Sequence, residues 1–151
     1  MADAADPAAV VRRILAALDR NDAAALRGLV AADHAEHPHW HEPLPLPGDE
    51  GQPVLDRYEQ ADAAAQLDWA EMRTTVEEQV ACGDRVATVW TAEATHRASG
   101  ARVVFRGIAV DRVAGGKVVE TWGSHDRLGL YQQLGVVGPT RELAERAGLH
   151  L

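Results

Sequence analysis

Apolar residues at the start of the chain recur with the period of an amphipathic helix: Val11, Ile14, Leu15 and Leu18. Asp6 is a favoured capping residue, and Pro7 suits the first helical position. Asn21 is expected to cap a second, short helix that turns Leu26, Leu29 and Val30 inward. The first part of the chain therefore predicts a helical pair.

The next segment, Asp33–Gly51, predicts irregular structure. Four prolines within it exclude helix and central strand: Pro38, Pro43, Pro45 and Pro47. A third helix is expected from about Pro53 to Leu67.

The second half predicts strands, because apolar and polar residues alternate between short turn signals. Four strands are expected: Glu71–Ala81, Arg85–Arg97, Ala101–Val113 and Lys117–His125. The turns at Gly83-Asp84, Ser99-Gly100 and Gly115-Gly116 would join them in an antiparallel meander. A short helix, Asp126–Leu134, and a tail helix capped by Thr140 would follow. Helices followed by a meander predict an α+β fold.

Two-residue turns would place Trp90 beside Ala109, and Ala109 beside Trp122. One face of the sheet would then carry Trp90, Ala92, Ala94, His96, Phe105, Gly107, Ala109, Glu120, Trp122, Ser124 and Asp126. The other would carry Val89, Thr91, Glu93, Val104, Arg106, Ile108, Val110, Val119, Thr121 and His125. Small residues beside large rings favour a ligand pocket on the first face, although helices could simply fill it. A bulge in any strand would change this assignment.

Composition narrows the class of protein. The chain of 151 residues fits one domain, 1–151, with residues 135–151 as its tail. Its net charge of −8 argues against nucleic acid and anionic membrane partners. We find no run long enough to span a membrane and no signal peptide, and the single cysteine, Cys82, fits a reducing compartment. A cytoplasmic protein is therefore expected.

The stretch from Gly107 to Gly135 contains Gly-Lys-Val-Val-Glu-Thr-Trp, then Asp-Arg-Leu-Gly-Leu-Tyr-Gln-Gln-Leu-Gly. This pattern resembles the SnoaL-like polyketide cyclase family, and the resemblance covers about residues 8–137. It implies a nuclear-transport-factor-2-like cone, in which helices close a curved antiparallel sheet around a pocket. The chain departs from the family at His34, where an aromatic residue is usual, in the segment Pro38–Pro47, and in the short Arg97–Gly100 turn.

In the cyclases that the sequence resembles, one aspartate transfers the proton in an intramolecular aldol ring closure, and Asp126 is at the matching position. Burial among Trp122, Phe105 and Trp90 would raise the pKa of this carboxyl group. The alternative is that Asp126 only caps the helix that follows it. Both roles are compatible.

Four histidines form a second group: His34, His37, His39 and His41. His37 matches the family pattern, so the resemblance implies that it lines the pocket and orients or protonates a carbonyl. A metal site is the alternative, because alternating histidines on an extended chain share a face. No complete ligand set supports it, so we expect no metal and no cofactor. His125, Arg106 and Glu93 are interpreted as a structural group on the opposite face.

Other chemistries fit the sequence less well. Epoxide hydrolysis would need an Arg and a second Asp across from Asp126, whereas Phe105, Gly107 and Ala109 are expected there. Dienone isomerisation would need an acidic donor, for which Tyr58 is the candidate.

The hypothesis is a cofactor-independent cyclase acting on a polyketide-like or other small poly-carbonyl molecule, with Asp126 and His37 as catalytic residues. The expected binding residues are Trp40, Tyr58, Trp90, His96, Phe105 and Trp122. A homodimer is expected through the Val/Ile/Thr face of the sheet. The alternatives are a non-catalytic small-molecule binding or accessory protein of the same fold, or an isomerase or hydrolase.

Overall fold

The computed structural model describes residues 6–37 and 69–149. Its elements, in chain order, are α1 (Pro7–Asp19), α2 (Ala23–Leu29), β1 (Val30–His37), β2 (Trp69–Cys82), β3 (Arg85–His96), β4 (Arg102–Ala114), β5 (Lys117–His125), α4 (Arg127–Gln133) and α5 (Thr140–Arg146). The five strands form one sheet in the order β1-β5-β4-β3-β2. The predicted α+β class and the antiparallel meander of β2 to β5 are confirmed.

Strand β1 was not predicted, because residues from Asp33 onward were expected to be irregular. It pairs in parallel with β5, and His37 lies opposite Trp122. This pairing joins segments that are more than 80 residues apart in the sequence, so no local sequence pattern predicts it.

The helix caps agree with the sequence in part. Asp6 caps α1 by accepting a hydrogen bond from the Ala8 amide at 3.1 Å. Asp22, rather than Asn21, caps α2 by accepting from the Ala25 amide at 2.9 Å. Asn21 instead has a φ of 52° in the turn between the helices. Thr140 begins α5 without capping it, because the cap position belongs to Pro139.

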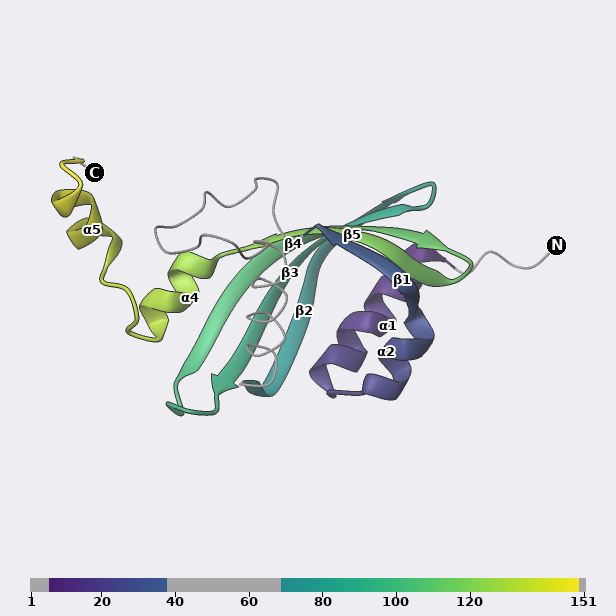
Figure 1. Ribbon diagram of the computed structural model, residues 1–151, viewed down its shortest axis with the longest axis horizontal. Coiled ribbons are helices and arrows are strands. Elements are labelled where there is room, and N and C mark those ends of the chain that lie inside the picture. Colours follow the sequence, from purple (N-terminus) through teal and green to yellow (C-terminus); the bar gives the residue numbers. More distant parts are fainter. Residues whose placement is uncertain (1–5, 38–68, 150–151) are drawn as a thin grey trace, which may run out of the picture.

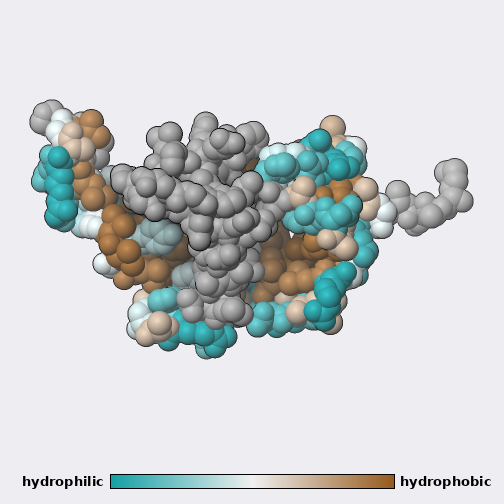
Figure 2. Space-filling model, viewed as in Figure 1, coloured by the Kyte–Doolittle hydropathy of each residue, from teal (hydrophilic) through white to brown (hydrophobic). Residues whose placement is uncertain are grey.

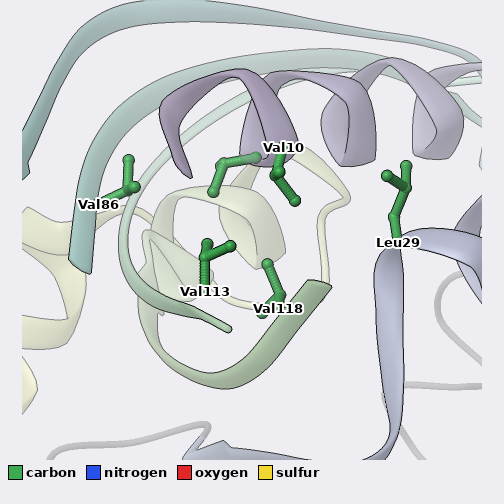
Figure 3. Packing of buried hydrophobic residues seen from close by; sticks show 6 residues of the cluster. Val10, Leu29, Val86, Val113 and Val118 are labelled. Carbon is green, nitrogen blue, oxygen red and sulfur yellow. The ribbon is translucent and has the colours of Figure 1, made fainter. Parts of the chain in front are cut away.

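We call the face of the sheet that the helices cover its inner face, and the opposite one its outer face. Figure 1 shows α1 and α2 beneath one end of the curved sheet and α4 beside the other end, next to β4. Beneath α1 and α2, a cluster of buried residues joins the helices to β3, β4 and β5: Val10, Val11, Leu29, Val86, Val113 and Val118 (Figure 3). These contacts anchor the helical pair to one end of the inner face.

A second cluster fixes α4 at the other end of the inner face. Leu130 of α4 packs on Ala94 and Val103, beside Trp69 and Phe105. Figure 2 shows apolar residues on both sides of the grey atoms, toward α1 and toward α4. The expected third helix, from about Pro53 to Leu67, lies outside the described residues.

Candidate functional site on the inner face of the sheet

A β-bulge decides which side chains of β5 reach the inner face. Val113 lies opposite Val118, but Arg112 lies opposite Glu120, so β5 has one extra residue, Val119, at this point. One extra residue reverses the faces of all side chains beyond it. The expectation that Trp122, Glu120 and Ser124 share the face of Trp90 is therefore wrong. Thr121, Gly123 and His125 lie there instead.

The faces of β3 and β4 were assigned correctly, although their register was not. Trp90 lies opposite Gly107 rather than Ala109. The connecting loop has four residues, 97–100, because the Ala101 carbonyl accepts from the His96 amide at 2.8 Å. A shift of two positions leaves every side chain on its expected face. Trp90 and Phe105 therefore both belong to the inner face.

An aromatic cluster covers the α4 end of this face. The ring centroids of Trp90 and Phe105 are 5.7 Å apart and the rings meet edge to face, and the His125 ring lies 6.1 Å from Phe105. Trp69 extends the cluster, 6.0 Å from Phe105 and 5.5 Å from His96. Such rings can stack on a flat, unsaturated ligand.

Small residues make up the middle of the inner face. A Cβ atom on Gly107 would come within 2.2 Å of the Trp90 indole, so the indole lies directly on the backbone of β4. At Gly123 a Cβ atom would meet no atom of the described residues within 4 Å, so these residues leave open space above β5. Gly123 and Ala109 therefore form a low floor beside the rings, whereas Gly107 is covered by the Trp90 indole.

Beyond this floor, toward α1, lies a group of hydrogen-bonded residues that we call the polar chain. The Thr121 hydroxyl donates to Oδ1 of Asp111 at 2.6 Å and lies 3.0 Å from Nε2 of His34. Asp111 is 8% exposed, and burial raises the pKa of its carboxyl group, opposed by the Thr121 hydrogen bond and by the attraction to His34 whenever that ring is protonated. His34 is half-buried.

Asp126 lies where β5 ends, next to the aromatic cluster. Its amide donates to the Arg106 carbonyl at 2.9 Å, and its Oδ1 accepts from the Gly129 amide at 2.8 Å as the cap of α4. The capping role is therefore present. The expected burial among Trp122, Phe105 and Trp90 is wrong, because Asp126 is exposed and Trp122 lies on the other face.

His37 and Trp122 belong to the outer face. Their rings stack with centroids 4.9 Å apart, and the Arg85 guanidinium lies over the Trp122 ring, 4.9 Å from its centroid. Nε2 of His37 is 3.1 Å from Glu120, which also accepts from Nε of Arg112 at 2.9 Å. The hydrogen bonds from Arg112 and His37 lower the pKa of the Glu120 carboxyl group, and Arg112 makes the larger contribution. His37 therefore does not line the inner face.

Four of the singled-out residues, Trp40, Tyr58, His39 and His41, lie outside the described residues. Within residues 6–37 and 69–149, no three His, Cys, Asp or Glu side chains are placed to hold a metal ion. No helix in the same ranges is long and apolar enough to cross a membrane.

Sequence reasoning missed the polar chain. It passed over Asp111, and it noted His34 only as a departure from the family pattern and as one of the four grouped histidines. The available signal was an aspartate in the apolar strand from Ile108 to Val113. Thr121 and His125 were assigned to the wrong face because the bulge at Val119 was not visible in the sequence.

Comparisons with known proteins show which family the chain belongs to and which solved structures share its fold. The family model of the SnoaL-like polyketide cyclases matches residues 8–134, and the chain belongs to this family. No curated protein matches the chain.

Solved structures share the fold. IdmH from Streptomyces antibioticus, provisionally assigned as a polyketide cyclase, is 26% identical with a TM-score of 0.67, over 87% of this chain and 99% of that one. AclR from Streptomyces galilaeus, provisionally assigned as a hydroxylase, is 22% identical with a TM-score of 0.68, over 87% and 97% of the two chains. A family membership of this kind supports a cyclase-type function.

Proposed function

We propose that the protein catalyses the aldol-type ring closure of a small, largely apolar poly-carbonyl molecule bound on the inner face of the sheet. The observation that carries the proposal is the arrangement of this face, with the aromatic cluster beside the low floor of Ala109 and Gly123. A flat molecule would stack on the rings and occupy the open space above Gly123.

The chemistry needs one group that accepts and returns a proton. A base removes a proton from a carbon between two carbonyl groups. That carbon attacks a third carbonyl carbon, a C–C bond forms, and the resulting alkoxide takes up the proton. The product has the composition of the substrate. The enolate charge is spread over two oxygens, so the reaction proceeds without a metal ion or cofactor.

Asp126 is the proposed base, on the strength of the family resemblance and its place directly after His125 of the aromatic cluster. Its cap on the Gly129 amide uses Oδ1. A carboxylate has a second oxygen with its own lone pairs, so capping does not prevent proton transfer. The cap would instead fix the direction of the carboxylate.

A homodimer through the outer face is proposed as well. Three apolar side chains there are 37–49% exposed: Val89, Val104 and Ile108. Because the helices cover the inner face, a second copy packed sheet to sheet is the simplest cover for these residues.

The function is tested with a synthetic aromatic triketone, in which two ketones flank a methylene group and the third is placed for six-membered ring closure. Purified protein treated with a chelator should accelerate the formation of a product of equal mass with one new ring, followed by mass spectrometry and NMR. Binding of the triketone without any rate above the protein-free control would favour the non-catalytic alternative.

A further inference from the structure

The polar chain lies at the opposite end of the inner face from Asp126. Thr121 and His125 are four residues apart on β5, which corresponds to roughly 13 Å along a strand. Asp126 and the aromatic cluster lie at the His125 end, and His34, Thr121 and Asp111 lie at the Thr121 end. An elongated ligand stacked on the rings would therefore point its far end at the polar chain.

The hydrogen bonds determine which group of the polar chain donates and which accepts at each contact. The Thr121 hydroxyl uses its one proton toward Asp111, so it must accept from His34, and Nε2 of His34 carries a proton. A neutral imidazole with a proton on Nε2 has an acceptor at Nδ1. Among the described residues, no hydrogen bond satisfies that nitrogen, and His34 is only half-buried.

The structure thus assigns the polar chain a binding role, which rests on the proposed function: we propose that His34 binds an enol or phenol hydroxyl at the far end of an elongated poly-carbonyl ligand. The ligand hydroxyl donates to Nδ1. Thr121 and Asp111 are positioning residues, because they hold the imidazole in the one tautomer that can accept this bond. The site determines specificity and lies away from the reacting carbons.

Two rigid, flat diketones separate the contributions of stacking and of the terminal hydroxyl. One is 2,6-dihydroxyanthraquinone, which has a hydroxyl at each end, and the other is unsubstituted anthraquinone. The wild-type protein should bind the dihydroxy compound more tightly, measured by quenching of tryptophan fluorescence. A single lost hydrogen bond corresponds to about a tenfold change in affinity.

Thr121→Val keeps the shape of the side chain but removes the hydroxyl. It should abolish the preference for the dihydroxy compound, by about tenfold, while leaving the affinity for anthraquinone unchanged. Thr121→Ser should restore the preference. The matched control is Thr91→Val, the same substitution on the outer face, which should change neither affinity.

A second readout is independent of the ligand. Nitrogen-15 spectra of the imidazole rings should show His34 as the Nε2–H tautomer in the wild type, and a mixture of tautomers in Thr121→Val. An equal loss of affinity for both compounds in Thr121→Val, or an unchanged preference, would overturn the assignment. Failure of the wild type to bind either compound would instead contradict the proposed function itself, and this site with it.

Discussion

Trp90 and Trp122 lie on opposite faces of the same sheet, and their surroundings differ in kind. Trp90 contacts Phe105 and His125, and its indole lies on the β4 backbone at Gly107, on the face where we propose that a ligand stacks. Trp122 stacks with the His37 ring and also contacts the Arg85 guanidinium, so protein groups already pack against its ring. The comparison teaches that an aromatic residue in a family motif can be a structural element of the outer face.

Two carboxyl groups repeat this contrast. Asp111 is buried on the inner face with one hydroxyl as its partner, and burial raises its pKa. Glu120 bridges Arg112 and His37 on the outer face, and these partners lower its pKa. Burial on the inner face therefore favours the neutral form of a carboxyl group, and the cationic partners on the outer face favour its charged form.

The largest expected effect tests whether the chemistry belongs to the inner face. Asp126→Asn should lower the turnover of the triketone by roughly 10²–10⁴ because the amide cannot take up a proton. Asparagine still caps a helix, so the unfolding midpoint should change little. Near-wild-type turnover would show that Asp126 acts only as the cap of α4.

The next effect concerns assembly through the outer face. Ile108→Asp would place a charge without a partner in the proposed sheet-to-sheet contact, and the dimer dissociation constant should rise by more than about 100-fold. Light scattering over a concentration series measures it. A wild-type chain that scatters as a 16.3 kDa monomer at micromolar concentration would contradict the dimer.

Gly107, next to Ile108 on β4, tests how tightly the inner face is packed. Gly107→Ala forces the Trp90 indole off the strand, because the new methyl group would overlap it, and should destabilise the fold by about 1–3 kcal/mol in urea unfolding. Gly123→Ala is the control for packing, since its methyl group meets no atom of residues 6–37 and 69–149 within 4 Å. It should leave stability within about 0.5 kcal/mol but weaken ligand binding. Equal destabilisation by both variants would mean that the space above Gly123 is filled.

Much of this arrangement could be predicted from the sequence. The tight turns at Gly83-Asp84 and Gly115-Gly116 and the strand pattern fixed the meander, and the family motif indicated the fold. The loop 97–100 was misjudged by two residues without consequence for the faces. Strand β1 could not be predicted, because its apolar pattern is weak and its partner is distant in sequence.

The candidate site was predicted less completely. One inserted residue, Val119, moved Trp122 to the outer face and brought Thr121 and His125 to the inner one. The inserted residue is a second valine directly after Val118, an ordinary strand sequence, so composition gives no sign of a bulge. Parallel pairing of β1 then put His34, rather than His37, on the inner face.

The smallest expected effect is the pH dependence of stability, which has opposite signs on the two faces. Because the pKa of Asp111 is raised, its protonated form stabilises the fold below the ordinary value of 3.8, and this contribution is lost as the pH rises through the raised pKa. Because the pKa of Glu120 is lowered, its contribution is present above 4.5 and is lost as the pH falls through the lowered pKa.

Urea unfolding between about pH 3 and pH 7 separates the two groups. Asp111→Asn should remove the decline on the alkaline side, and Glu120→Gln should remove the decline on the acid side. If both variants flattened the same side of the curve, the contrast between the faces would be wrong.

The central claim is that ligands bind on the face of Trp90 and not on the face of Trp122. Fluorine-19 NMR of protein labelled with 5-fluorotryptophan tests it most directly, with resonances assigned by Trp90→Phe and Trp122→Phe. Titration with 2,6-dihydroxyanthraquinone should shift the Trp90 resonance and leave the Trp122 resonance in place. A shift of the Trp122 resonance with Trp90 unmoved would contradict the account.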